Sequence, residues 1–369
     1  MKTLIAMSGG VDSSVVAFLL KEAGHECIGA MMKLYEESGE GQHPIENGCC
    51  SLSDAEDARD IANALGIPFY VFNFTKTFSE EVMERFTKAY LKGTTPNPCI
   101  DCNRFVKFKK FLLRAEELDC NYIATGHYAQ IEKDNSTGRF LLKRGIDHSK
   151  DQSYVLYAMT QDQLARTLFP LGGFTKEEVR KIAEARKFVN ANKRDSQDIC
   201  FAPDGDYARF IQRYVQDFKV EKGKFINKEN RVLGEHKGII HYTVGQRKGI
   251  GAIIQNPEPL YVTAINPTEN TVTVGLKEEL YSKTVQATDI NLIPFDKLEH
   301  SMRVTAKVRY NSVAQPATLW QEGHDLIRLE FDTPQRAITP GQAVVIYDDA
   351  LVIGGGTING YTSEPIHFP

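Results

Sequence analysis

Residues 3–14, TLIAMSGGVDSS, decide the fold of the first part of the chain. The apolar run predicts a buried strand over Thr3–Met7, and the next stretch predicts a helix over residues 11–23 that ends at Gly24. Glycines between a strand and a helix let successive backbone N–H groups converge on an anion at the positive end of the helix. We therefore interpret Ser8–Ser14 as a phosphate cradle.

The cradle differs from two common nucleotide-binding loops. It lacks the lysine of G-x-x-x-x-G-K-[ST], and it is not G-x-G-x-x-G. A plain glycine-rich turn does not need Asp12 and three serines, whereas a carboxylate suits the magnesium that accompanies pyrophosphate. The stretch resembles the PP-loop of ATP pyrophosphatases, which form adenylates and release pyrophosphate.

The rest of the first 130 residues alternates apolar runs with amphipathic stretches, a pattern typical of a parallel sheet with crossover helices. We expect further strands at residues 26–33, 69–74 and 122–125. A capping box formed by Ser53 and Glu56 predicts a helix that runs to about Ala64. Another helix is expected over Asn103–Leu118.

The pattern changes to short alternating strands from about Lys222. Apolar and basic residues alternate over residues 302–309, which predicts a strand with an apolar inner face and a basic outer face. Several such strands indicate a small barrel. The loop at Pro203–Asp206 is the expected boundary after the α/β part.

Composition limits the classes of protein to consider. The 369 residues carry a net charge of −4 and are 42% apolar, as in globular proteins of two or three domains. The longest apolar run near the N-terminus, Val15–Leu20, is far shorter than the roughly 20 residues of a membrane span, and no signal peptide is recognisable. The 7 cysteines, an odd number, indicate reduced thiols. We expect a cytoplasmic protein with no membrane partner.

Charge is segregated along the chain. The run from Arg85 to Arg114 holds eight Lys or Arg residues against Asp101 alone, whereas residues 36–60 hold eight Asp or Glu residues against Arg59 alone. Either run, taken by itself, is explained as the solvated face of a helix.

Residues 95–103, TPNPCIDCN, form a loop restrained by two prolines just before the predicted helix. Cys102 is therefore expected near a helix N-terminus and close to Arg104 and Lys107, where the helix dipole and the cations favour the nucleophilic thiolate. The C-x-x-C spacing from Cys99 to Cys102 is equally that of half a zinc or iron–sulfur site.

Three further polar segments are candidates for binding loops. His127 in TGHYA follows the carboxyl end of a predicted strand, the edge where open α/β sheets bind ligands, although a lone histidine is usually structural. Cys200, beside Ile199 and Phe201, has by itself the character of a small buried hydrophobe. The other two segments are KDQSY at residues 150–154 and GEHKGIIHYTVGQRKGIG at residues 234–251.

Six motifs together, SGGVDSS, TPNPCIDCN, TGHYA, KDQSY, QDICF and YTVGQRKG, resemble in this order the tRNA-specific 2-thiouridylase (MnmA) family over the whole chain. The resemblance implies an α/β protein with a PP-loop domain of the adenine nucleotide alpha hydrolase-like kind over residues 1–205. A small central β-containing domain would span residues 206–280, and a C-terminal β-barrel would span residues 281–369. The implied reaction adenylates the 2-oxo group of the wobble uridine with ATP, after which sulfur displaces AMP.

The same resemblance implies residue roles. Cys200 would receive a persulfide, and Cys102 would help release its sulfur by forming a disulfide with it. ATP would contact the PP-loop and two outlying positions, namely Ala6, Met7, Ser8, Gly9, Gly10, Val11, Asp12, Ser13, Met32 and Gly126. The target base and the rest of the tRNA would contact Asn97, Pro98, Cys99, His127, Lys150, Asp151, Gln152, Arg309, Tyr310 and Gln342. ATP and Mg²⁺ are implied as cofactors, with tRNA and a sulfur donor, either a cysteine desulfurase or a sulfur-relay protein, as partners.

Alternatives remain open at this point. Many family members carry Asp where this chain has Cys99, so Cys99, Cys102 and Cys200 form a three-thiol set that suits a 4Fe–4S cluster with one open iron. No other metal ligands are assigned. An amide-forming PP-loop synthetase would need no paired thiols, and an RNA-binding adaptor with structural zinc would leave SGGVDSS unexplained.

Overall fold

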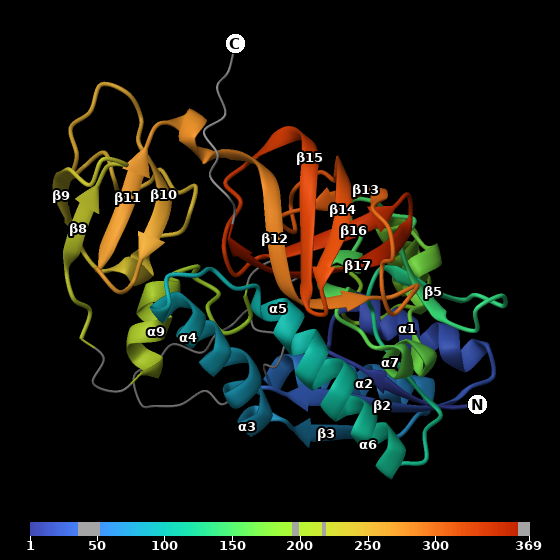
Figure 1. The fold of residues 1–369 in the computed structure, drawn as a ribbon. Coiled ribbons are helices and arrows are strands. Elements are labelled where there is room, and N and C mark those ends of the chain that lie inside the picture. The colour runs from blue at the N-terminus through green and yellow to red at the C-terminus, as the bar shows by residue number, and fades with distance from the viewer. Residues whose placement is uncertain (36–51, 194–198, 216–218, 361–369) are drawn as a thin grey trace. The chain divides into compact units, whose positions relative to one another are not determined.

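The computed structural model describes residues 1–35, 52–193, 199–215 and 219–360, which fold into two compact units (Figure 1). The first unit comprises residues 1–83, 98–205 and 350–352, and the second comprises residues 84–97, 206–349 and 353 onward. The acidic residues before position 52 and the start of the QDICF motif lie outside the described residues.

A parallel five-stranded sheet forms the centre of the first unit. Its strand order is β3 (Phe69–Asn73), β2 (Glu26–Lys33), β1 (Lys2–Ala6), β4 (Tyr122–Ala124) and β7 (Thr167–Leu168). The predicted strands are confirmed, with ends shifted by at most one residue. The chain leaves β1 toward β2 on one side and later returns to β4 on the other. This reversal makes the carboxyl ends of β1 and β4 a topological switch point, where open α/β sheets bind their ligands.

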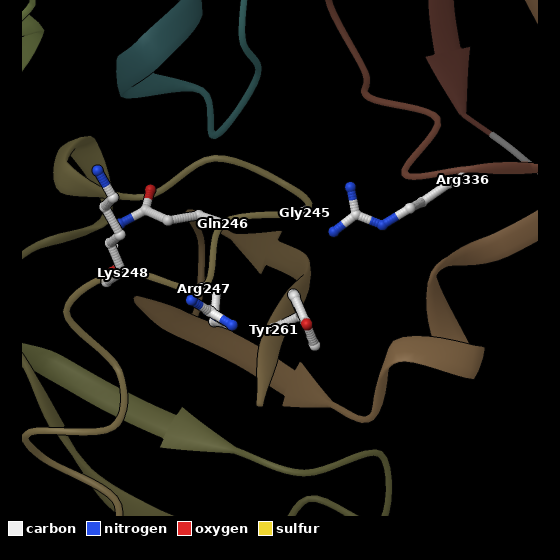
Figure 2. Close-up of a pocket in the computed structure, with 6 residues that line it drawn as sticks. All are labelled: Gly245, Gln246, Arg247, Lys248, Tyr261 and Arg336. Carbon is white, nitrogen blue, oxygen red and sulfur yellow. Dashed lines mark hydrogen bonds between the residues drawn. The ribbon is translucent and has the colours of Figure 1, made fainter. Parts of the chain in front are cut away.

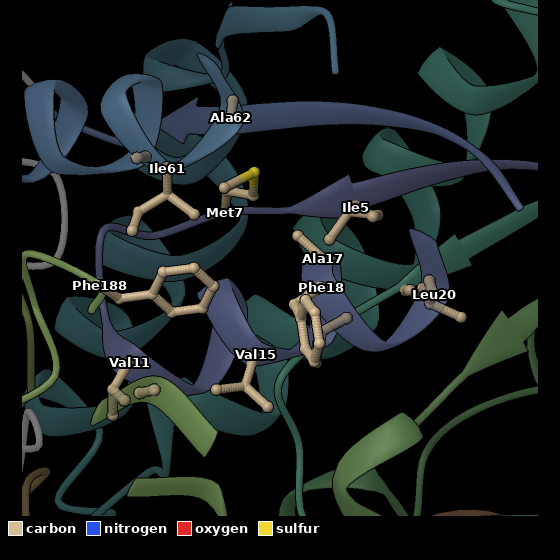
Figure 3. Packing of buried hydrophobic residues seen from close by; sticks show 14 of the residues in the cluster. Ile5, Met7, Val11, Val15, Ala17, Phe18, Leu20, Ile61, Ala62 and Phe188 are labelled. Atoms are coloured by element: carbon tan, nitrogen blue, oxygen red, sulfur yellow. The ribbon is translucent and has the colours of Figure 1, made fainter. Parts of the chain in front are cut away.

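Helices cover the sheet and bury its apolar residues. The predicted first helix is confirmed as α1 (Val11–Glu22), which is followed by Gly24 at a φ of +79°. Figure 3 shows side chains of α1, of β1 and of α2 (Leu52–Leu65) gathered in one core with Phe188. The remaining helices of this unit include α3 (Thr75–Phe78), η1 (Ser79–Met83), η3 (Ser153–Leu156), α7 (Gln161–Ala165), η4 (Pro170–Gly173) and α8 (Lys176–Ala185).

Two helix predictions need correction. The helix α2 already includes Leu52, so Ser53 lies inside it and does not cap its N-terminus. The expected helix over Asn103–Leu118 begins earlier and is not a uniform α-helix. It consists of α5 (Pro98–Asp101), the π-helix η2 (Cys102–Lys110) and α6 (Phe111–Glu117). The 3.6-residue periodicity of apolar positions does not reveal the wider turns of a π-helix.

The second unit contains a four-stranded sheet with the strand order β10 (Tyr261–Asn266), β11 (Thr271–Gly275), β8 (Gly223–Ile226) and β9 (Val232–His236). Two helices of this unit pack together through aromatic rings. Phe86 of α4 (Glu84–Leu91) lies 5.7 Å from the Tyr207 ring and 5.9 Å from the Phe210 ring of α9 (Tyr207–Tyr214). The 3-10 helices η5 (Ile239–His241) and η6 (Lys277–Leu280) connect strands.

A closed six-stranded barrel forms the C-terminal part, as the fold class predicts. Its strands follow the order β12 (Tyr281–Leu292), β15 (Leu326–Arg336), β14 (Gln315–Gly323), β13 (Met302–Lys307), β16 (Ala343–Asp348) and β17 (Leu351–Gly360), and β17 pairs with β12. The alternation over residues 302–309 is confirmed, since Val304, Ala306 and Val308 are buried.

The hairpin of β5 (Ala129–Lys133) and β6 (Phe140–Arg144) belongs to the first unit. Lys143 is in register with Leu351, and residues 350–352 group with that unit. Within the described ranges, no helix is long and apolar enough to cross a membrane.

Candidate nucleotide and thiol site

The predicted phosphate cradle lies between β1 and α1, at the carboxyl end of β1. Gly9 has a φ of +74°, and a Cβ at this position would lie 2.3 Å from the backbone oxygen of Asp54. Gly126 approaches the cradle from the end of β4, where a Cβ would lie 3.1 Å from the Cβ of Asp12. Both glycines are therefore required by close backbone approaches, and the two predicted ATP-binding segments meet here.

Side chains hold the cradle in shape. The Ser13 hydroxyl donates to the Gly10 carbonyl at 3.0 Å and accepts from the backbone N–H of Ser8 at 3.2 Å. The Ser14 hydroxyl also donates to the Gly10 carbonyl. The buried Asn190 amide donates to the Gly9 carbonyl and to the Ser14 hydroxyl, both at 2.9 Å. The loop conformation is thus built before any phosphate binds.

Asp12 is the carboxylate of the cradle, and Lys176 is its cationic partner. The Lys176 Nζ lies 2.7 Å from Asp12 Oδ1, and the Tyr128 hydroxyl donates to the same oxygen at 2.8 Å. Lys176 is buried with 8% relative exposure, although it occupies the first position of α8, where a cation opposes the helix dipole. Lys176 is not among the residues predicted from the sequence. Its one local signal is the Thr175–Glu178 capping box, which places a lysine at an unfavourable position in a helix.

Lys193 joins the cradle to the start of α2. Its ammonium lies 2.6 Å from the carboxylates of both Asp54 and Asp57 and 3.4 Å from the Gly9 carbonyl. Burial acts to lower the Lys193 pKa, but the hydrogen bonds to the two carboxylates outweigh it and raise the pKa above its usual value. Asp54 and Asp57 therefore stabilise the loop through Lys193. They are not simply part of a solvated helix face, as the acidic run alone suggested.

His127 lies beside the cradle segment Thr125–Gly126 and is buried. Its Nδ1 is 2.7 Å from the Thr125 hydroxyl, and its ring packs against Phe108 and Phe169 at centroid distances of 5.7 and 5.8 Å. Burial, with a smaller contribution from the charge of Lys107, lowers the His127 pKa well below its usual value. A neutral, packed imidazole fits the structural interpretation of this histidine, and its contact with tRNA remains a prediction.

The KDQSY segment is braced by its own side chains. The buried Asp151 accepts hydrogen bonds from the backbone N–H groups of Gly145 and Ser153 and from the Ser153 hydroxyl. Gln152 Oε1 accepts from the backbone N–H of Tyr128 at 3.0 Å. This bonding holds the segment against the residues that follow β4, and Lys150 stays half-exposed.

The three candidate thiols differ in exposure. Cys99 is exposed, Cys102 is buried and Cys200 is intermediate. Cys102 lies near a helix N-terminus as expected, but the helical segment begins earlier than predicted, at Pro98, and Cys102 follows one turn later. Proline is favoured in the first turn of a helix, which explains the earlier start.

The structure gives no support to a metal cluster at these thiols. No group of three or more His, Cys, Asp or Glu side chains among the described residues is arranged to hold a metal ion. Among the described side chains, Cys99, Cys102 and Cys200 are therefore not brought together as a metal-binding group.

Two predicted tRNA contacts of the second unit also have internal bonds. The Gln342 amide donates to the carbonyls of Thr95 and Pro96 at 2.7 and 3.2 Å, directly before the predicted base-binding residue Asn97. Arg309 Nη2 donates to the carbonyls of Val244 and Ala337 at 3.0 and 2.7 Å. Tyr310 is 36% exposed. Gln342 and Arg309 thus hold backbone segments in place, and their contacts with tRNA remain predictions.

A serine- and glycine-rich loop at the switch point of a parallel sheet, with a carboxylate held inside it, defines a PP-loop nucleotide-binding protein. Comparison with known families agrees with this class. The chain matches models described as a tRNA methyl transferase HUP domain over residues 1–204, a tRNA methyl transferase PRC-barrel domain over residues 208–276 and an aminomethyltransferase beta-barrel domain over residues 282–358.

Full-length relatives identify the family. A tRNA-specific 2-thiouridylase MnmA of Clostridioides difficile is 50% identical over 357 residues, covering 97% of this chain and 98% of that relative. Another from Natranaerobius thermophilus is 51% identical over 365 residues, covering 98% of each. The chain belongs to the tRNA-specific 2-thiouridylase (MnmA) family.

Proposed function

We propose that this protein is an ATP-dependent tRNA 2-thiouridylase, which replaces the 2-oxygen of the wobble uridine by sulfur. The observation that carries the proposal is the preformed PP-loop in the same unit as Cys102 and Cys200. Membership of the MnmA family over nearly the whole chain supports the substrate, tRNA. The individual site residues implied by the resemblance are part of this proposal.

The first step activates the base. The uridine O2 attacks the α-phosphorus of ATP, pyrophosphate leaves, and the base becomes an adenylate whose AMP is a good leaving group. The backbone N–H groups at the start of α1 suit the phosphates of ATP. Lys176 pairs with Asp12, and this ion pair places the Lys176 ammonium beside the same loop.

Magnesium fits this loop only as a partner of the substrate. Mg²⁺ is commonly held by one or two carboxylates together with substrate phosphates, and Asp12 is the carboxylate of the loop. Asp12 Oδ1 accepts hydrogen bonds from Lys176 and Tyr128. The ion would neutralise charge on the phosphates and the leaving pyrophosphate.

The second step transfers sulfur. The terminal sulfur of a persulfide on Cys200 attacks C2 of the adenylated uridine, and AMP leaves with the former O2. The Cys102 thiolate then attacks the Cys200 sulfur, which releases the thiocarbonyl of 2-thiouridine and leaves a Cys102–Cys200 disulfide. A thiol reductant reopens this disulfide, and a cysteine desulfurase or sulfur-relay protein restores the persulfide.

The proposed domain limits are residues 1–205, 206–280 and 281–369, and the proposed location is the cytoplasm. The disulfide of the catalytic cycle and the sulfur-donor protein belong to the same proposal. Persulfide transfer is favoured over a cluster mechanism because the three thiols form no metal-binding group among the described side chains.

A pyrophosphate-release assay with and without bulk tRNA tests the function. A thiolating enzyme releases pyrophosphate only when tRNA is present, and mass spectrometry of the digested tRNA shows 2-thiouridine when a persulfide donor is supplied. An amide-forming synthetase turns over without RNA, and an RNA-binding adaptor shows no turnover. Either of the last two outcomes refutes the proposal.

A further inference from the structure

The second unit contains an open basic hollow that the proposed reaction does not use. Its volume is about 600 Å³, and it is lined by Gly245, Gln246, Arg247, Lys248, Tyr261 and Arg336. Four of these residues belong to the glycine-punctuated segment that the sequence analysis identified as a candidate binding loop. Figure 2 shows the Arg336 guanidinium directed toward this loop and toward the Tyr261 ring.

The hollow is lined by basic side chains and by no acidic side chain that would balance their charge. Arg247, Lys248 and Arg336 are exposed, and no Asp or Glu lines the hollow. No ion pair among the described residues involves any of these three side chains. The Arg336 guanidinium lies 5.5 Å from the centroid of the Tyr261 ring. Three cations therefore remain available to an anionic ligand beside an aromatic face.

Backbone hydrogen bonds hold the hollow in a fixed shape. The Gly245 N–H donates to the Val262 carbonyl at 2.8 Å, and the Val262 N–H donates to the Gln246 carbonyl at 2.9 Å. These bonds tie the loop to β10, the strand that carries Tyr261. Gly245 has a φ of +90°, and a Cβ there would lie 2.8 Å from the Ala337 Cβ.

Arg309 fixes the two basic walls relative to each other. Its Nη2 donates to the carbonyl of Val244, directly before the loop, and to that of Ala337, directly after Arg336. The half-buried Arg309 guanidinium bridges these two backbone carbonyls and so keeps both segments at a set distance. The cations of the hollow thus project from a preorganised frame, which lowers the entropic cost of binding.

We propose that this hollow binds one unpaired nucleotide of the RNA substrate, with its phosphate between Arg336 and the Arg247–Lys248 pair and its base against Tyr261. The inference rests on the proposed function, because it takes tRNA as the ligand. A groove that combines cations with an aromatic platform is the usual arrangement for single-stranded nucleic acid. A free phosphate would use the cations and leave the aromatic ring without a role.

Two variants of the full-length protein separate the phosphate contact from the stacking contact. Arg336→Gln is expected to weaken tRNA binding about 5- to 10-fold and to reduce the slope of log Kd against log salt by about 0.7 to 0.9, the share of one phosphate contact. Tyr261→Leu is expected to weaken binding about 5- to 100-fold with an unchanged salt slope, since stacking is sequence-tolerant and uncharged. Tyr261→Phe should bind as the wild type does.

Matched controls make the comparison specific. Lys228→Gln removes an exposed cation of the same unit that does not line the hollow, and it should leave Kd and slope unchanged. Thermal melting of each variant checks folding, and Tyr261→Phe with restored affinity excludes a merely structural effect of Tyr261→Leu. Wild-type affinity and slope in Arg336→Gln overturn the site. Weakening in Arg336→Gln without any in Tyr261→Leu reduces it to an anion contact and overturns the nucleotide assignment.

Failure of this inference can be distinguished from failure of the proposed function. If the wild type forms 2-thiouridine but both variants bind tRNA normally, only the hollow is refuted. If the wild type fails to bind or thiolate tRNA, the proposed function itself fails.

Discussion

At the scale of single residues, the cradle depends on an ion pair between the buried Lys176 and the half-buried Asp12. Asp12 and Lys176 lie 164 positions apart in the chain, and their ion pair is reinforced by the Tyr128 hydroxyl. Removing one member of a buried pair leaves an uncompensated charge, which is far more costly than losing an exposed pair. Neither side chain can therefore be changed without disturbing the loop that is proposed to hold ATP.

The three thiols have different expected roles. Cys102→Ser and Cys200→Ser should each abolish thiolation, because one residue carries the persulfide and the other releases its sulfur. Cys99→Ser and Cys99→Asp should retain substantial activity, since Cys99 takes no part in the sulfur transfer. The measurement is single-turnover thiolation by metal-free protein loaded with persulfide sulfur. Loss of activity in Cys99→Ser, with activity in the wild type only after cluster reconstitution, would instead support iron–sulfur chemistry.

His127 makes stability depend on pH. Its pKa in the folded protein is lowered by burial, so below about pH 6.5 the unfolded chain binds a proton that the folded protein does not. The free energy of unfolding should therefore fall on acidification, by up to about 2 kcal/mol between pH 7 and pH 5 from this residue.

Urea unfolding of the wild type and of His127→Gln at both pH values measures this contribution. The variant has no imidazole at position 127 to titrate, so the pH dependence of its unfolding midpoint should be the smaller of the two. Other histidines titrate equally in both proteins and cancel in the comparison. Parallel pH profiles would show that His127 is not the residue responsible.

At the scale of elements, one backbone position controls the cradle. Gly9→Ala should destabilise the protein by about 2 to 4 kcal/mol, because alanine disfavours a φ of +74° and its Cβ would overlap the backbone of α2 at Asp54. Gly10→Ala is the matched control, since Gly10 has a φ of −88° and the nearest atom to its Cβ would be 3.5 Å away. Thermal melting compares the two variants, and equal melting temperatures would contradict the strained position of Gly9.

Buried parallel strands were the elements most easily predicted, because each is a short continuous apolar run. The role of Ser53 was harder to predict. A serine followed by a glutamate three residues later caps a helix only if the helix begins there, and the local pattern is the same inside a longer helix. The π-helix over residues 102–110 was also beyond prediction, since its apolar residues still recur at nearly helical spacing.

At the scale of the whole molecule, the candidate site was predicted where it is continuous in sequence and missed where it is not. The PP-loop and the Thr125–Gly126 segment contain glycines whose role can be predicted from the neighbouring residues in the sequence. Lys176, Asn190 and Lys193 reach the same loop from more than 150 residues away. These residues approach the loop only in the folded chain. A local sequence pattern does not indicate which distant carboxylate or carbonyl a polar side chain will contact.

A mutation in the cradle is expected to lower the rate of pyrophosphate release without lowering the affinity for tRNA. Asp12→Asn should lower the rate of pyrophosphate release by about 100-fold, because the loop loses the carboxylate that is proposed to hold Mg²⁺ beside the phosphates. Its tRNA affinity should stay within about twofold, since RNA is held by many phosphate contacts and Asp12 lies inside the cradle. Asp134→Asn, which removes the charge of a half-exposed carboxylate of the first unit, is the control for the charge change. Pyrophosphate release and gel-shift affinity that fall together would contradict the separation.

The helix α4 and the loop after it interrupt the first unit, since residues 84–97 fold with the second. A recombinant chimera joined at Gly205 would therefore take α4 from one parent and its aromatic partners on α9 from the other. Phe86, Tyr90, Tyr207 and Phe210 would have to be inherited as a set for the rings to interlock. Residues 84–97, fourteen positions that fold with the second unit, therefore constrain the exchange of segments between members of this family. No single crossover point keeps each unit from one parent.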